Sequence, residues 1–198
     1  IRYGMERARI SNAERQLLEE TLHGSIKALT GVLALANPTA FGRAMRLKRY
    51  VSEVAQRLGI EERWHIEVAA MVSQVGCVNL PPETCDRLYR GRTLSPDEQK
   101  VVDRLPEMAQ ALVANIPRLE PVSQVLAHQR LTGSRPVVSG QRSPDRMPRD
   151  AQLLRIALEF DRLEASCGSL PQALARLEER RQAYDADLFE AFVESRLC

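Results

Sequence analysis

The sequence lacks any long uninterrupted apolar run, and its first residues are polar and unlike those of a secretory signal. A helix needs about 20 consecutive apolar residues to cross a bilayer, whereas 27% of this chain is charged. We therefore expect a cytoplasmic protein with no membrane partner. The sequence begins with Ile1 instead of Met, so we also expect it to be part of a longer protein.

The chain is also poor in the residues that bind metals. It has 3 histidines, and its cysteines include no C-x-x-C pair and none with a neighbouring histidine; they are Cys77, Cys85, Cys167 and Cys198. Zinc sites and redox motifs both depend on such spacing. These absences favour free thiols and no cofactor.

Positive and negative charges nearly balance, since 28 Lys and Arg against 26 Asp and Glu give a net charge of +2. The charges are interspersed along helical faces and are not gathered into a basic patch. Domains that bind nucleic acids usually carry such a patch, so the composition does not favour nucleic acid as a partner. The loop at 135–149 is the one segment through which DNA binding would be expected.

Apolar residues recur at steps of three and four along most of the chain, which is typical of helices, and no strand pattern competes with them. Ser11 and Glu14 form a capping box that opens a long N-terminal helix. The apolar stripe of this helix is either a dimer seam or part of the domain's own core, with the core favoured for its second half. It comprises Leu18, Leu22, Ile26, Leu29, Leu33 and Ala36.

Helix breakers divide the rest of the chain. Asn37-Pro38 ends the first helix, Gly59 ends a second, and Gly76 ends a third. The sequence SPDE at 95–98 predicts a new helix start, with a capping serine and a proline in the first turn.

We expect Pro106 to kink the helix that starts at SPDE without ending it, because apolar periodicity resumes beyond it. Further helices are expected over about 120–131, 150–166, 170–184 and 187–198. The predicted fold class is therefore all-α, a bundle of seven to nine helices with a long N-terminal helix.

Five segments, in this order along the chain, carry a resemblance to a known family. They are NPTAFGRAMRL (37–47), SQVGCVNLPPE (73–83), LSPDEQKVVDRLP (94–106), AHQRLTGSRP (127–136) and AQLLRIALEFDRL (151–163). Their order and spacing resemble the HD-GYP domain, the branch of the HD phosphohydrolase superfamily whose active members hydrolyse cyclic di-GMP at a centre of two or three iron ions. The resemblance implies an HD-domain-like bundle over 20–198, preceded at 1–19 by a linker and the start of a signalling helix.

The same alignment of the five segments shows where this chain departs from the family. The positions that match the family's metal-binding and catalytic residues are Arg43, Ser73, Gln74, Cys77, Leu105, Ala127, His128 and Leu158. Only His128 keeps the family's residue type. Leucine and alanine offer no lone pair, and the cation of Arg43 would repel a divalent metal ion. The resemblance therefore implies a degenerate, catalytically inactive domain with no metal and no cofactor.

The substitutions also indicate how the interior is filled. Leu105 and Leu158 are expected to fill the former metal cavity, and each burial would contribute about 1.5–3 kcal/mol. Arg43 needs a carboxylate or carbonyl partner, because an unpaired buried charge is costly. A solitary His128 is either a hydrogen-bonded residue of the core or rim or, less often, a metal ligand.

The resemblance implies a protein-interaction module for signal output in bacterial two-component or cyclic di-GMP signalling. Its implied partners are an upstream receiver domain in the same chain and a protein such as a diguanylate cyclase, with a homodimer through the N-terminal helix. The alternative is a cyclic di-GMP sensor or a weak phosphodiesterase. A cluster that could bind such an anion, or could be a solvated face, comprises Arg87, Tyr89, Arg90 and Arg92.

Overall fold

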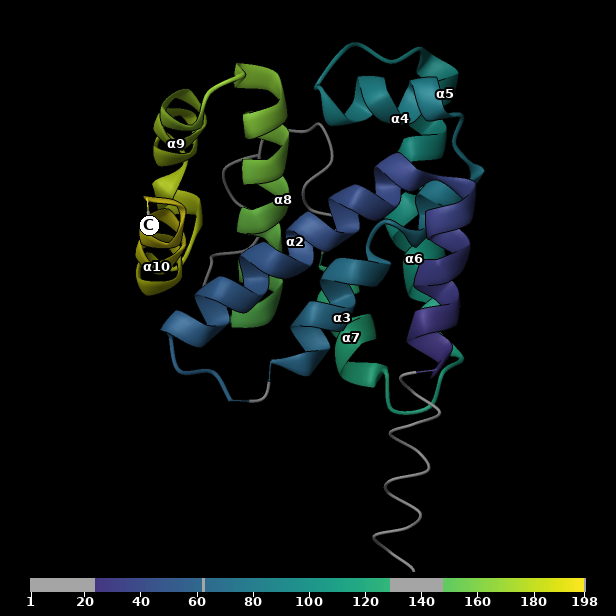
Figure 1. Cartoon of the computed structure of the whole chain (residues 1–198), viewed down its shortest axis with the longest axis horizontal. Coiled ribbons are helices and arrows are strands. Elements are labelled where there is room, and N and C mark those ends of the chain that lie inside the picture. The colour runs from purple at the N-terminus through teal and green to yellow at the C-terminus, as the bar shows by residue number, and fades with distance from the viewer. Residues whose placement is uncertain (1–23, 62, 129–147, 198) are drawn as a thin grey trace, which may run out of the picture.

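The computed structural model describes residues 24–61, 63–128 and 148–197, and all regular elements in these ranges are helical (Figure 1). The first is a helix over 24–36, the described part of the expected N-terminal helix. The elements after it are α2 (Pro38–Arg57), α3 (Trp64–Val72), η1 (Val75–Asn79), α4 (Pro82–Tyr89), α5 (Pro96–Val102), α6 (Leu105–Ala114), α7 (Glu120–Ala127), α8 (Arg149–Cys167), α9 (Leu170–Glu178), η4 (Arg181–Ala183) and α10 (Ala186–Leu197). The nine helices α2 to α10 of the described residues confirm the predicted all-α bundle.

Helix α2 is the centre of the arrangement and packs against α3, α8 and α10. It crosses the middle of the molecule between the helix at 24–36 and the C-terminal helices (Figure 1). The side chain of Asn37 caps its start, where Oδ1 accepts a hydrogen bond from the amide of Ala40 at 3.0 Å. Helix α2 ends at Arg57. Gly59 follows two residues later with a positive φ of 65°, a conformation that glycine adopts at little cost.

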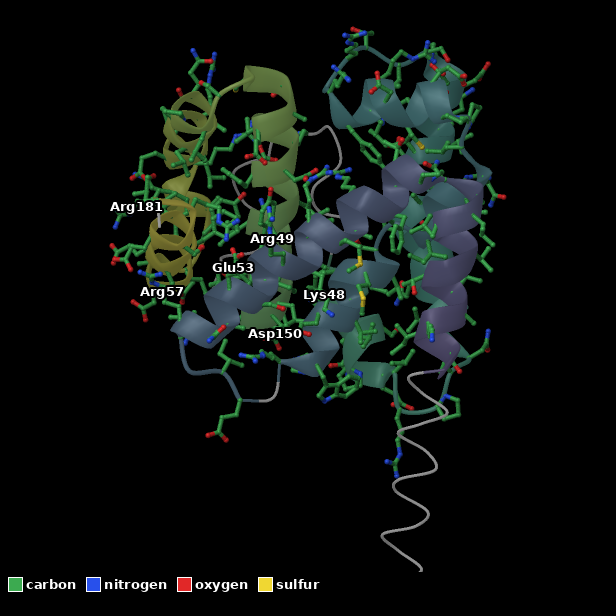
Figure 2. The ribbon with its side chains drawn as sticks, in the orientation of Figure 1. Lys48, Arg49, Glu53, Arg57, Asp150 and Arg181 are labelled. Carbon is green, nitrogen blue, oxygen red and sulfur yellow. The ribbon has the colours of Figure 1, made fainter. Side chains whose placement is uncertain are left out.

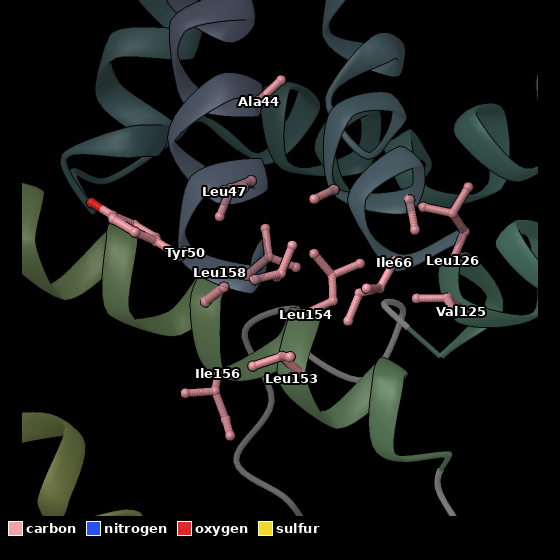
Figure 3. Close-up of a cluster of buried hydrophobic side chains, with 14 of the residues drawn as sticks. Ala44, Leu47, Tyr50, Ile66, Val125, Leu126, Leu153, Leu154, Ile156 and Leu158 are labelled. Carbon is pink, nitrogen blue, oxygen red and sulfur yellow. The ribbon is translucent and has the colours of Figure 1, made fainter. Parts of the chain in front are cut away.

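One part of the hydrophobic core lies where α2, α3, α7 and α8 meet (Figure 3). Leu47 of α2, Ile66 of α3 and Leu126 of α7 surround Leu154 of α8 in this cluster. All four side chains are buried. Their burial fixes α2 against α8, which is the interface that holds the candidate site.

The apolar stripe of the N-terminal helix contributes in part to this core. Ile26 and Leu33 are buried, so the core interpretation is confirmed for these two residues, whereas Ala36 is exposed. Leu18 and Leu22 lie outside the described residues, as do the predicted capping box at 11–14 and the linker at 1–19. No helix among the described residues is both long and apolar enough to cross a membrane.

The structure corrects three predicted boundaries. The helix predicted over 170–184 ends at Glu178, and η4 follows it. Pro106 does not kink a continuous helix, because α5 ends at Val102 and Pro106 lies in the first turn of α6, where a missing amide hydrogen costs nothing. The third helix ends at Val72 and not at Gly76, which lies instead in η1. A Cβ atom on Gly76 would lie 2.9 Å from the backbone oxygen of Leu105, so the glycine permits η1 to pack closely on α6.

Helix α4 was not predicted. Pro82 occupies its first helical turn, a position that proline favours. The SPDE prediction was correct. Ser95 Oγ accepts from the Glu98 amide at 3.3 Å, and Glu98 Oε2 accepts from the Ser95 amide at 2.8 Å, as in a capping box.

Charged side chains on the surface are paired along and between helices. On α2, Arg49 lies 3.8 Å from Glu53, and Arg57 lies 3.2 Å from Glu194 of α10 (Figure 2). Positive and negative groups therefore alternate on this surface, as the interspersed charges of the sequence indicated.

Candidate functional site

The candidate site is centred on Arg43, which the HD-GYP resemblance aligns with that family's first metal histidine. Its side chain enters the α2–α8 interface, where Nε donates a hydrogen bond to Oδ2 of Asp161 at 2.7 Å. Arg46, one turn further along α2, donates from Nε to Oδ1 of the same carboxylate at 3.0 Å. The Asp161 side chain is 1% exposed and that of Arg43 is 10% exposed. Asp161 is therefore the partner that Arg43 needs, and the sequence did not identify it.

Tyr89 of α4 covers the other side of the Arg43 guanidinium, whose carbon lies 4.4 Å from the centre of the tyrosine ring. A cation above an aromatic face is stabilised electrostatically, and more so when both groups are shielded from water. Burial also raises the pKa of Tyr89, so the phenol keeps its proton. Arg43 is thus enclosed by one carboxylate and one neutral aromatic ring.

Ser73 and Gln74, which the resemblance aligns with the family's His-Asp pair, form a hydrogen bond with each other. Gln74 Nε2 donates to Ser73 Oγ at 2.9 Å, and Ser73 Oγ donates to the carbonyl of Ala70 at 2.8 Å. The Tyr89 hydroxyl lies 3.3 Å from Gln74 Oε1 and 3.4 Å from Cys77 Sγ, and it donates its single proton to one of them at a time. Tyr89 therefore links Arg43, Gln74 and Cys77 into one buried polar network.

Cys77, which the resemblance aligns with the family's catalytic lysine, shares Asn37 as a hydrogen-bond donor with a second cysteine, Cys85. Asn37 Nδ2 donates both to the Cys77 carbonyl and to Cys85 Sγ, each at 3.1 Å. The neighbouring Cys85 thiol, together with burial, raises the pKa of the Cys77 thiol well above its ordinary value, so Cys77 keeps its proton.

Leu105 and Leu158, which the resemblance aligns with metal ligands of the family, are both buried, as predicted. Leu158 lies in the α8 part of the core near Leu47 and Leu154 (Figure 3), and Leu105 lies against Gly76 at the start of α6. Neither side chain has an atom that could bind a metal ion. The predicted filling of the interior by these two residues agrees with their burial.

Ala127 and His128, the last two positions that the resemblance aligns with metal ligands, lie at the end of α7. Ala127 is half-buried, and His128 caps the helix with Nδ1 2.8 Å from the carbonyl of Gln124. This bond lies within its own helix, so it agrees with the interpretation of His128 as a hydrogen-bonded rim residue. The segment GSRP at 133–136 lies outside the described residues.

The arginines near α4 do not converge on a shared anion site. Arg87 pairs with Glu98, and Arg90 Nε lies 2.8 Å from Asp86 Oδ1, while Tyr89 points inward to Arg43. Arg92 is exposed. The structure therefore favours the interpretation of this cluster as a solvated face.

Sequence reasoning missed Tyr89, Asn37 and Cys85 as members of the network. Asn37 was interpreted only as a helix breaker, although an asparagine before a proline at a helix start is also a typical cap. Tyr89 was assigned to a surface cluster because its neighbours in the sequence are arginines. The helical spacing of Tyr89 from Cys85 was a usable signal, since residues four apart share one face.

The residues of the site do not fit the divalent metal ions that active members of the HD-GYP branch bind. A catalytic metal needs several imidazole or carboxylate ligands and an open position for water. Here Asp161 is saturated by two arginines, and Cys77 holds its proton. Among the residues that the structure describes, no group of three or more His, Cys, Asp or Glu could hold a metal ion.

Comparison with known proteins gives one match. A family model described as HD domain matches residues 27–188, which include every position of the candidate site. No curated protein and no solved structure shows significant similarity to the chain. The match agrees with the helical architecture and with the resemblance at the level of the HD superfamily, and it indicates a phosphohydrolase-type fold. From its sequence match and its all-α bundle, the chain belongs to the HD domain family.

Proposed function

We propose that this HD domain is a degenerate member of the HD-GYP branch that does not hydrolyse phosphodiesters and acts as a protein-interaction module for signal output. The setting that we propose is bacterial two-component or cyclic di-GMP signalling. The observation that carries the proposal is the buried Arg43–Asp161 ion pair. In this pair the guanidinium of Arg43 carries a permanent positive charge, and Arg43 is the residue that the resemblance aligns with the family's first metal ligand.

The chemistry of the site supports the loss of hydrolysis. Activation of water for attack on phosphorus requires a metal-bound hydroxide or a general base. Each oxygen of Asp161, the buried carboxylate of the site, already accepts a hydrogen bond from an arginine, Arg43 or Arg46, so this carboxylate is not free to contact a water molecule as a general base. Ser73 donates its proton to a backbone carbonyl, so no base activates it as a nucleophile.

An exposed apolar surface on the helix at 24–36 supports the interaction role. Val32 is 55% exposed and Leu35 is 88% exposed, and Ala28 and Ala36 are exposed on the same helix. Apolar side chains gathered on one helix face are typical of protein-binding surfaces. We propose that this face binds the partner, either a second copy of the chain or a protein such as a diguanylate cyclase, and that residues 1–19 lead to an upstream receiver domain.

The hydrolysis part of the proposal is tested by assaying the purified chain with cyclic di-GMP in the presence of Fe²⁺ or Mn²⁺, together with elemental analysis. We expect no turnover and no stoichiometric metal. Turnover, or about two equivalents of bound metal as in a two-metal centre, would contradict it. Calorimetry with cyclic di-GMP decides the alternative, because micromolar binding without turnover would favour a sensor.

The interaction part is tested with Val32→Glu and Leu35→Glu in a measurement of molar mass by light scattering and in a two-hybrid assay with candidate cyclases. We expect both substitutions to weaken association and to leave the helical content unchanged. Leu197→Glu is the matched control, because Leu197 is also exposed, at 68%, but lies on α10 at the far side of the molecule (Figure 1). Equal effects of all three substitutions would contradict the proposed surface.

A further inference from the structure

We infer that the exposed face of the helix at 24–36 binds a second copy of this chain, with the two helices side by side and antiparallel. This dimer rests on the proposed function, since it names the partner of the surface proposed there. It goes beyond that function in fixing which residues of the two copies meet. The direction of pairing follows from the order of large and small side chains along the helix.

The helix at 24–36 lies at one edge of the molecule, at the right of the view, where a second copy can approach it (Figure 1). Ile26 and Leu33 are buried and face the core. Residues at steps of four and three lie in one line along a helix, and such a line is exposed on the face opposite the core. It comprises Gly24, Ala28, Gly31 and Leu35. Val32 lies beside this line and is also exposed.

This exposed face carries little charge. Lys27 is the one charged residue between positions 24 and 36. The exposed residues of α2, in contrast, include Arg46, Arg49 and Arg57. A strongly charged partner would therefore find few groups to pair with on the helix at 24–36. The face is complementary to an apolar surface of low charge, and the same face of a second copy is such a surface.

The side chains along the line increase in size towards one end. Gly24 and Gly31 have no side chain, and a Cβ atom added at either position would meet no atom within 4 Å. Leu35, at the other end, is a large apolar side chain that is 88% exposed. One end of the line is therefore a shallow surface that can receive a side chain, and the other end supplies one.

Antiparallel pairing matches the two ends. It brings Leu35 of each copy over Gly24 of the other copy, and it brings Ala28 opposite Gly31. Parallel pairing would place the two Leu35 side chains against each other and leave a gap between the two Gly24 residues. Interfaces pack closely and leave few voids, so the antiparallel direction fits this helix. A two-fold axis relates the copies, and the association closes at two.

The length of the contact sets the strength of the dimer. The helix at 24–36 rises about 1.5 Å per residue, so the contact is about 20 Å long. Two helices of this length bury less than the roughly 1,200 Å² at which stable interfaces begin. We therefore expect a dimer that dissociates on dilution.

The test uses the full chain and exchanges the sizes of two residues, with Gly24→Leu and Leu35→Ala in separate proteins. Gly24→Leu blocks the surface that receives Leu35, and Leu35→Ala removes the side chain that fills it. We expect each variant alone to raise the dimer Kd by about tenfold or more. Sedimentation velocity between about 10 µM and about 1 mM measures the Kd.

An equimolar mixture of the two variants tests the direction of pairing. In an antiparallel heterodimer, the leucine introduced at position 24 of one copy faces the alanine introduced at position 35 of the other. The second contact is then that of the wild type. We expect the mixture to recover the wild-type Kd to within about threefold, and native mass spectrometry identifies the heterodimer by its mass. Parallel pairing gives no such recovery, so a mixture as weak as the single variants would overturn the antiparallel arrangement.

Two further outcomes would overturn the dimer. They are a wild type that stays monomeric up to about 1 mM, and a wild-type dimer that neither substitution weakens. The proposed interaction role fails separately, when Val32→Glu and Leu35→Glu leave the two-hybrid signals unchanged. Leu197→Ala is the matched control and should not change the Kd, because Leu197 is also exposed but lies on α10. Circular dichroism establishes that each variant keeps its helical content.

Discussion

Two arginine–aspartate pairs in this protein have nearly the same geometry and very different surroundings. In the α2–α8 interface, Arg43 Nε lies 2.7 Å from Asp161, and on the surface of α4, Arg90 Nε lies 2.8 Å from Asp86. The first pair is almost completely buried and the second is about half exposed on both sides. Distance alone would rank the two pairs as equal.

The difference lies in what remains when one partner is removed. If Asp86 is lost, water solvates Arg90, and such surface pairs contribute about 0–1 kcal/mol. If Asp161 is lost, the buried Arg43 has no counter-ion, and Arg46 loses its partner as well. The buried pair is a requirement of the interface that contains it, whereas the exposed pair is a minor addition to one helix.

The largest expected effect comes from Asp161→Asn. We expect the free energy of unfolding to fall by about 3–5 kcal/mol, because an uncompensated charge stays buried. Asp86→Asn is the matched control and should change it by less than about 1 kcal/mol. Urea denaturation followed by circular dichroism measures both. Equal losses in the two variants would contradict the comparison.

Arg43→Met should have a smaller effect than Asp161→Asn. Methionine has a similar length and is apolar, and Asp161 keeps its hydrogen bond from Arg46. The variant loses one charge-assisted hydrogen bond, for which we expect about 1.5–3 kcal/mol. The same denaturation experiment measures it. A loss larger than that of Asp161→Asn would mean that Arg46 does not compensate for the missing cation.

Gly76 and Gly42 allow a similar comparison, because a Cβ atom would clash at the first glycine and meet no atom at the second. Gly76→Ala would place its Cβ 2.9 Å from the Leu105 backbone oxygen, so we expect a loss of about 1–3 kcal/mol as η1 and α6 move apart. Gly42→Ala in α2 meets no atom within 4 Å and should stabilise the helix by about 0.5–1 kcal/mol. Thermal unfolding of the two variants should therefore shift in opposite directions. A shift in the same direction would contradict the close approach at Gly76.

The smallest expected effect is the pH dependence contributed by Glu98 on the surface. Hydrogen bonds from the Ser95 amide and from Thr84 lower the pKa of Glu98 to about 2. Its folded pKa is thus below its unfolded value of about 4.3, so its stabilisation is present above that pH and is lost as the pH falls towards 2. The stability difference between the wild type and Glu98→Gln should shrink over this range. A constant difference would show that the carboxylate charge is not involved.

The sequence predicted those features that depend on neighbours in the chain. The breaks at Asn37-Pro38 and Gly59, and the capping box at Ser95, result from local backbone chemistry, and all are observed. Pro106 was misjudged because a proline inside an apolar pattern is compatible both with a kink and with a new first turn. The sequence contains no local signal that separates these two outcomes.

The interior of the site could be predicted only in part. Burial of Leu105 and Leu158 was expected from their apolar side chains, and the need of Arg43 for a partner was expected from its charge. The identity of that partner depends on packing between α2 and α8, whose residues are 118 positions apart. Tyr89 was misassigned for a similar reason, because its burial depends on how α4 packs and not on its arginine neighbours.

The sharing of Asp161 between two arginines has an evolutionary consequence. Exchange of Arg43 for histidine would remove a stabilising ion pair at once, while the other residues of the site would still offer no ligand set for a metal ion. Replacement of Arg43 alone therefore lowers stability before it can add any chemistry. Selection for a folded protein is thus sufficient to oppose this exchange.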